Sequence, residues 1–307
     1  MKRKIKPVDI AVTLFFIVIM LVGIAVVMYP IFSSWWNDRV QTKIIEQYEK
    51  SVATLDTAEK ERMFNEAYAY NAELNKLPNP MKDYKELSGY SDILDVTGTG
   101  IMGYIDIPKI NVHLPIYHGT SAEVLNIAVG HMEGTSLPVG GIDTHSVISA
   151  HSGHPSAKLF SSIDQLTEDD RFTISVLDEV YTYEVEGSSV VLPYNTDKLQ
   201  VVPGQDLVTL LTCTPYGINT HRLLVRAHRI ETEAAAEETA EHKVRVPADA
   251  VLIASISSMP FIILPLIFIL MVYWALRGKP KIKRYISEYT SEKDVGSAIE
   301  DKDSKKE

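Results

Sequence analysis

The chain has 307 residues, of which 46% are apolar and 23% are charged, with a formal net charge of −10. An acidic chain lacks the basic surface that nucleic acids require, so we expect no nucleic-acid partner. Its one cysteine, Cys213, excludes an internal disulfide. It has neither a glycine-rich phosphate loop nor zinc-type Cys/His spacing, so we expect no metal and no cofactor.

Two uncharged, apolar runs are long enough to cross a membrane, at residues 10–37 and 250–276. About 20 apolar residues span a bilayer core. Lysines and arginines lie before the first run and after the second, and such positive flanks stay in the cytoplasm. We predict transmembrane helices at 10–34 and 250–276, cytoplasmic ends at 1–9 and 277–307, and an exported middle. The resulting two-pass protein contacts membrane lipid. The alternative for the first run is a cleaved signal peptide.

Residues 35–99 are expected to form an extracellular helical region followed by a loop. Val40, Ile44, Tyr48 and Val52 recur at helix spacing up to residue 52. A new helix is expected after Asp56, because Asp56 and Glu59 match a capping box. The stretch "KLPNPMKDYKELSGYSD", residues 76–92, then interrupts the helical pattern with two prolines and a glycine, which predicts an irregular loop.

Residues 100–230 change to the alternation and short apolar runs of β-strands. The clearest are "MGYIDIPKINVHLPIY", "THSVISAH", "RFTISVL", "VYTYEVEGSSVV", "DLVTLLTC" and "HRLLVRAHRIE". Many short strands indicate a sandwich or a closed barrel, and the nearly apolar "DLVTLLTC" favours a barrel. Pro108 and Pro115 are expected at strand ends or edges. A polar linker is predicted at residues 231–249.

Cys213 ends an apolar strand and precedes a turn, a position that suits a nucleophile. The alternative is a small buried hydrophobe. A reactive thiol needs a base or a counter-cation, and several histidines could supply it. They lie around the strand at 144–151 or on the strand after the cysteine: His145, His151, His154, His221 and His228. The residue pattern does not choose among them.

Arg222 follows Cys213 by nine residues, across a predicted tight turn. A hairpin would bring the two strand ends together and place the guanidinium near the thiol, where it could stabilise an acyl oxyanion. The alternative is a solvated or ion-paired arginine. From these residues alone we infer an exported acyl-transfer enzyme of the Cys/His/Arg type.

"TLLTC", residues 209–213, resembles the TLxTC signature of sortases, the cysteine transpeptidases of Gram-positive surfaces. "CTPYGINTHRLLVRAHR", "HSGHPSAKLF", "VGHMEGTSLPVGG" and the strand at 102–117 are similar to class C, the pilin-polymerising branch. The resemblance implies a mainly β fold. It consists of a sortase-type closed β-barrel at residues 100–230, two N-terminal helices outside it, and two flanking transmembrane helices.

The resemblance also assigns roles to individual residues. It implies that Cys213 is the nucleophile, His151 the general acid and base, and Arg222 the oxyanion-stabilising residue, with Thr209 and Thr212 contacting substrate. The implied reaction cleaves an LPXTG-like motif between Thr and Gly through a thioester on the cysteine. It then joins pilin subunits by an isopeptide bond to a lysine, which assembles pili.

The chain departs from the family pattern beside the histidine. Ala150 stands where glycine is usual, and Ser152 and His154 stand where the family has an arginine and an apolar residue. We expect these changes to alter substrate fit and to leave the base in place.

A second departure concerns the lid that often covers the cysteine in class C. The Asp-Pro-aromatic motif of that lid has its nearest counterpart in Asn79, Pro80 and Met81. Asparagine cannot form an ion pair with an arginine, so we predict a weak or atypical lid. Two rival functions remain open: a sortase that anchors proteins to cell-wall precursor, and an inactive surface scaffold.

Overall fold

The computed structural model describes residues 7–153 and 157–231. The predicted second membrane run, the linker beyond residue 231, the C-terminal tail and His154 lie outside these residues. The segment Met28–Arg245 forms one compact unit, and it contains the whole barrel.

The first helix, α1 (Pro7–Ala53), is continuous through the predicted membrane segment and the first extracellular helix. It is the one helix within residues 7–153 and 157–231 that is long and apolar enough to cross a membrane. The expected boundary at residue 34 is therefore not a break in secondary structure, since the helix continues through it to Ala53.

The second helix, α2 (Thr57–Leu74), begins where the sequence predicted. The Asp56 carboxylate accepts a hydrogen bond from the backbone N–H of Glu59 (2.8 Å), which satisfies one of the free donors at the helix start. The Glu59 carboxylate pairs instead with Arg62. On the barrel side, α2 buries Met63, Ala67 and Leu74, and this stripe accounts for the helix pattern in the sequence.

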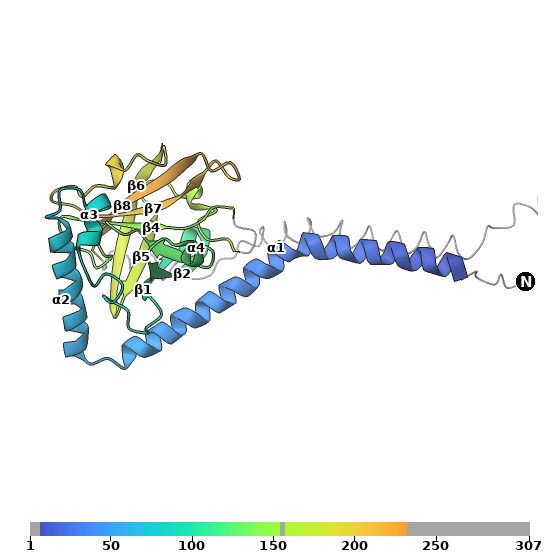
Figure 1. Cartoon of the computed structure of the whole chain (residues 1–307), viewed down its shortest axis with the longest axis horizontal. Helices are drawn as coiled ribbons and strands as arrows, with labels where there is room; N and C mark the ends of the chain where they lie inside the picture. Colours follow the sequence, from blue (N-terminus) through green and yellow to red (C-terminus); the bar gives the residue numbers. More distant parts are fainter. Residues whose placement is uncertain (1–6, 154–156, 232–307) are drawn as a thin grey trace, which may run out of the picture. The chain divides into compact units, whose positions relative to one another are not determined.

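Eight strands close into a barrel in the order β1-β2-β3-β4-β7-β8-β6-β5 (Figure 1). Two pairs, β2 with β3 and β4 with β7, are parallel, and the other neighbours are antiparallel. The closed barrel agrees with the sequence prediction. The strands are β1 (Ile101–Ile107), β2 (Val112–His118), β3 (Val129–His131), β4 (Thr144–Ser149), β5 (Arg171–Val176), β6 (Glu179–Val191), β7 (Asp206–Thr214) and β8 (His221–Ile230).

One strand was not predicted. The strand β3 was not anticipated, because three residues are too few to show a period of two. Pro115 lies within β2, opposite Tyr104 of β1. Because β3 pairs with β2 only from Ile116 to His118, Pro115 has a strand on one side alone, which is the edge position expected for it.

The loop at 76–92 is more ordered than its prolines suggested. It holds the one-turn helix α3 (Pro80–Asp83) and the 3₁₀ turn η1 (Tyr84–Glu86). The other short helices are η2 (Pro108–Ile110), α4 (Ala122–Leu125), η3 (Ile163–Gln165) and η4 (Asp197–Leu199).

Buried polar side chains attach both long helices to the barrel. The Tyr48 hydroxyl donates to the carbonyl of Met102 (3.2 Å) and accepts from the N–H of Leu177 (2.8 Å). From α2, the Asn71 side chain exchanges two hydrogen bonds with the backbone of Leu137. These bonds pair buried side chains with the barrel backbone, so the helices are fixed in orientation as well as by apolar contact.

A second polar contact holds the segment after η1 on the barrel. The fully buried His131 ring donates from Nε2 to the carbonyl of Ser136 (2.8 Å) and accepts at Nδ1 from the Tyr90 hydroxyl (2.8 Å). Tyr90 also accepts from the N–H of Gly119 (2.9 Å). This arrangement requires a neutral imidazole, and burial lowers the pKa of His131 from 6.5 to about 4.

The stability of the protein should therefore decrease as the pH falls through this interval. The unfolded chain binds a proton at His131 near pH 6.5, whereas the folded chain binds it only near pH 4. The stabilisation is complete above pH 6.5 and is lost between 6.5 and 4, by about 3 kcal/mol for this group. Thermal unfolding of the detergent-solubilised chain, followed at several pH values, measures it.

The matched comparison is His131→Gln against His221→Gln, a half-exposed histidine of β8. The first variant should flatten the fall between pH 6.5 and 4, and the second should leave it unchanged. Equal slopes in wild type and His131→Gln would contradict the assignment.

Candidate active site

Cys213 lies near the end of β7, the strand that pairs with β4 on one side and β8 on the other. Alternate residues of these strands face opposite sides of the barrel wall. Val208 and Leu210 enter the main core, while Leu211 faces outward. Cys213 has the same parity as Leu211, so its thiol is on the outer face, where it is half-buried.

An apolar patch lies on this outer face, directly before the cysteine. We call it the outer cluster. Its buried members are Val147, Leu199, Leu211 and Leu224, and Met81, Met132 and Val191 pack against them. Sequence reasoning missed this cluster because its members come from four strands, two short helices and the residue after β3, and no local pattern links them.

His151 follows β4 at the same end of the barrel as Cys213. The parallel pairing of Ser149 with Leu211 continues for one more step, since the N–H of Ala150 donates to the carbonyl of Leu211 (3.1 Å). Ala150 is buried in the main core, so the next residue is directed to the outer face. This register brings His151 level with Cys213, as the resemblance implied.

Arg222 is the direct cross-strand neighbour of Cys213 in the β7–β8 hairpin. Its Nη1 donates to the carbonyls of Asn219 (3.2 Å) and His221 (3.0 Å), which orients the guanidinium over the turn. The predicted hairpin is therefore confirmed, and the thiol and guanidinium belong to a directly paired position on one sheet.

His145 is on the same face of β4, but both of its ring nitrogens bond to neighbouring protein groups. Its Nδ1–H donates to the carbonyl of Gln200 (2.8 Å), so Nε2 accepts from the Thr209 hydroxyl (2.7 Å). Both nitrogens are satisfied by a neutral ring, and burial lowers the pKa of His145. A histidine in this state supports the strand pairing and has no free nitrogen to act as a base.

Thr209 and Thr212, the two residues implied to contact substrate, are both buried, at 1% and 3% exposure. Thr209 bonds to His145 and lines a cleft of about 320 Å³ with Leu224 and Arg226. The Thr212 hydroxyl donates to the carbonyl of Ala150 (2.7 Å). Substrate contact by either residue stays a prediction, and Thr212 ties the residue before the nucleophile to the residue before His151.

The remaining described histidines have other neighbours. His221 is next to the β7–β8 turn, where its Nδ1 contacts the Thr220 hydroxyl (2.9 Å). His228 is near the other end of β8, 3.4 Å from Glu186. Of the five histidines that the sequence left open, His151 is the described one that the fold brings level with the cysteine.

The predicted lid segment rests against the outer cluster. Met81 packs against it, while Asn79 is exposed and its side chain forms no capping bond to α3. The backbone at Pro80 and Met81 lies tight on Gly134, where an added Cβ would come within 2.8 Å of the Pro80 carbonyl oxygen. The segment therefore covers the apolar face just before the cysteine, through its methionine.

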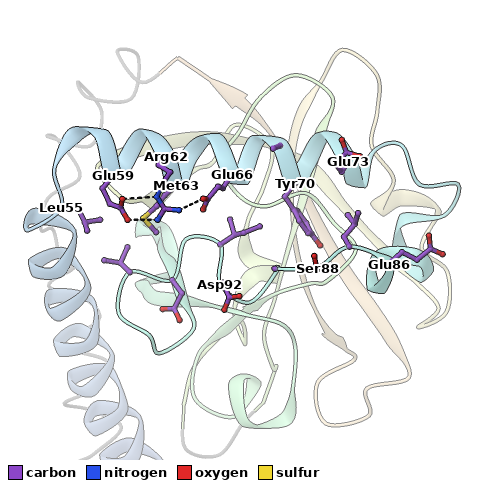
Figure 2. Close-up of a pocket in the computed structure, with 16 residues that line it drawn as sticks. Leu55, Glu59, Arg62, Met63, Glu66, Tyr70, Glu73, Glu86, Ser88 and Asp92 are labelled. Atoms are coloured by element: carbon purple, nitrogen blue, oxygen red, sulfur yellow. Dashed lines mark hydrogen bonds and ion pairs between the residues drawn. The ribbon is translucent and has the colours of Figure 1, made fainter.

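A larger cleft, of about 840 Å³, lies between α2 and residues 86–96 (Figure 2). Carboxylates line it, and Arg62 projects from α2 to pair with Glu59 and Glu66. Neither a cysteine nor a histidine is among its lining residues. The larger cleft therefore does not contain the candidate residues, which belong to β7, β8 and the end of β4. Within the described residues, no group of three or more His, Cys, Asp or Glu side chains could hold a metal ion.

Comparison with known proteins gives a consistent result. The model of the Sortase domain family matches residues 105–230. Sortase A of Streptococcus agalactiae serotype III (strain NEM316) is 29% identical over 136 residues, which are 43% of this chain and 54% of that protein. The chain thus spans about half the length of that curated relative.

Solved structures match over a longer part of the fold. Sortase C1 from Streptococcus agalactiae is 44% identical with a TM-score of 0.56, and the match covers 62% of this chain and 98% of that one. Sortase C from Streptococcus pneumoniae is 42% identical with a TM-score of 0.57, covering 62% and 97%.

The bond between Thr212 and Ala150 gives a prediction for the site. Thr212→Val removes the hydroxyl and leaves a buried carbonyl unpaired, which should destabilise the protein by about 1–3 kcal/mol. It should also slow alkylation of Cys213 by iodoacetamide at pH 7, because the two strand ends that carry the thiol and the histidine are no longer tied. Thr212→Ser keeps the hydroxyl and should keep both properties. Equal stability and equal alkylation rates in Thr212→Val and Thr212→Ser would show that the hydrogen bond from Thr212 to Ala150 contributes to neither property.

Proposed function

Because the chain belongs to the sortase family of cysteine transpeptidases, and to its class C branch, we propose that it cleaves an LPXTG-like sorting motif and polymerises pilin subunits. The observation that supports this proposal is the strand register: Arg222 is paired directly with Cys213, and the β4–β7 pairing runs up to the residue before His151 at the same end of β7. The solved Sortase C of Streptococcus pneumoniae is described in terms of pilin substrate specificity, which supports the substrate class.

In the proposed reaction, the Cys213 thiol gives its proton to His151, and its sulfur attacks the carbonyl carbon of the motif threonine. The C–N bond to glycine breaks, and His151 gives a proton to the departing glycine amine, which leaves a thioester on Cys213. The amine of a lysine on the next pilin subunit then attacks the thioester and loses its proton to His151. An isopeptide bond forms as the C–S bond breaks, and His151 returns the proton to the sulfur, which restores the thiol.

Arg222 is suited to the charge that develops in both tetrahedral intermediates. Its Nη1 hydrogens are used on the carbonyls of Asn219 and His221. Within the described part of the chain, no protein hydrogen bond uses its Nε or Nη2, so these donors are available to an oxyanion. A guanidinium held in place before the reaction needs no reorganisation as the charge appears.

We propose that the protein crosses the membrane twice, with the barrel on the extracellular face and both ends in the cytoplasm. The apolar, charge-free part of α1 supports the first span. The second, at residues 250–276, rests on sequence alone. The barrel would then be held where exported pilin precursors emerge.

The acyl-enzyme is the first thing to test. The detergent-solubilised full chain, incubated with an LPXTG-type peptide, should gain the mass of the acyl fragment on Cys213 in mass spectrometry. Cys213→Ala should gain none, because the thioester has no sulfur to form on. A lysine-bearing pilin domain should release the adduct faster than a cell-wall precursor amine. The reverse order would favour the anchoring function.

We also propose that the 79–81 segment acts as a lid through Met81 rather than Asn79. Met81 packs against the outer cluster, where the apolar residues of a sorting motif would lie on the approach to the thiol. Asn79 is exposed and contributes no side-chain cap to α3. This division differs from a lid held by an ion pair to an arginine.

Two alanine variants separate these roles. Met81→Ala should speed iodoacetamide alkylation of Cys213 several-fold, because it removes contacts that hold the segment on the outer cluster. Asn79→Ala should leave the rate unchanged, and Lys82→Ala, exposed in the same turn, serves as the surface control. An unchanged rate in Met81→Ala would remove the basis for a lid.

A further inference from the structure

The turn after Cys213 contains a tyrosine, Tyr216, that is not part of the hydrophobic core. Tyr216 is 70% exposed in the segment between β7 and β8. Its ring nevertheless meets one specific backbone position, Gly153, two residues after His151. A Cβ on Gly153 would lie 2.9 Å from Cε2, 3.0 Å from Cζ and 3.3 Å from Cδ2 of the ring. The ring edge therefore lies directly over the glycine.

Gly153 is suited to this contact in two ways. Its φ of +76° is in the left-handed region that side chains with a Cβ rarely adopt. It also has no side chain to displace the ring. The Gly153 N–H donates to the Ser161 hydroxyl (2.9 Å), and the Phe160 N–H donates to the carbonyl of His151 (3.2 Å). The backbone beneath the ring is thus held from the other side.

The turn that holds Tyr216 is itself fixed. The N–H groups of Ile218 and Asn219 both donate to the carbonyl of Pro215 (3.0 and 2.9 Å). Arg222 donates to the carbonyl of Asn219. A chain of contacts therefore runs from the guanidinium, through the turn and the Tyr216 ring, to the backbone beside His151.

We propose that Tyr216 is a positioning residue, whose ring holds the His151 loop at a fixed distance from the Cys213–Arg222 hairpin. The inference rests on the proposed function, since it concerns how the acid–base residue is aligned with the nucleophile. The hydrogen bond from Thr212 to Ala150 joins the end of β7 to the segment that carries His151. The Tyr216 ring is a second contact between the same two segments. Alignment matters because an error of about 1 Å can cost on the order of 100-fold in rate.

The test uses the detergent-solubilised full chain and a substrate-independent readout, the pH dependence of Cys213 alkylation by iodoacetamide. Tyr216→Ala should move the midpoint of this profile toward that of His151→Ala and lower kcat for peptide cleavage roughly 10-fold with little change in KM. Tyr216→Phe keeps all three ring carbons that face Gly153 and should behave as wild type. Ile218→Ala, at an equally exposed position in the same turn, is the control.

A double-mutant cycle tests the contact itself. Gly153→Ala alone forces its Cβ against the ring, whereas in the Tyr216→Ala background the Cβ has room. The penalty of Gly153→Ala should therefore be smaller in that background. Additive effects would overturn the proposed contact.

The outcomes separate this inference from the proposed function. If His151→Ala shifts the alkylation profile and Tyr216→Ala does not, the positioning role is wrong while the Cys–His pairing stands. A Tyr216→Ala variant that changes KM alone, with an unaltered profile, would show a substrate contact instead. If His151→Ala leaves the profile unchanged, the pairing fails, and the inference fails with it.

Discussion

The position of β7 between β4 and β8 is the constraint on which the site depends. The parallel register with β4 sets the height of His151, and the antiparallel register with β8 places Arg222 opposite Cys213. A shift of one residue in either pairing would turn the affected side chains to the other face of the wall. The main core prevents such a shift, because Val208, Leu210 and Val225 would then leave the barrel interior.

The polarity of the outer face of these three strands changes along their length. At one end, His145 and Thr209 satisfy each other's hydrogen bonds, and in the middle the outer cluster is apolar. Cys213 and Arg222, which we propose as reactive groups, lie at the other end, beside the β7–β8 turn. A peptide approaching the thiol along this face would cross an apolar surface that Met81 now covers. The same surface can therefore serve as a binding floor and as a seat for the 79–81 segment.

Much of the fold follows from local patterns, and the reason is physical. Strand alternation, the restart of the helix at Asp56 and the Cys213–Arg222 hairpin each depend on residues close together in the chain. The choice of His151 over His145 does not. It depends on the parallel β4–β7 pairing and on the carbonyl of Gln200, which accepts a hydrogen bond from the His145 ring. No local sequence pattern contains either contact. For the same reason, the resemblance identified the 79–81 segment, but only the packing shows that Met81 meets the outer cluster.

The tie between Thr212 and Ala150 joins residues 62 positions apart, and this separation has a consequence for biogenesis. Parallel pairing between distant segments forms more slowly than a hairpin, because the long intervening loop must lose conformational entropy before the stabilising contacts form. Cys213 and Arg222 can meet in a local hairpin, whereas His151 joins them only when the barrel closes. Before the barrel closes, Cys213 is therefore without the histidine that we propose as its acid–base partner. The complete set of three side chains exists only in the finished fold, so the proposed activity should depend on barrel closure.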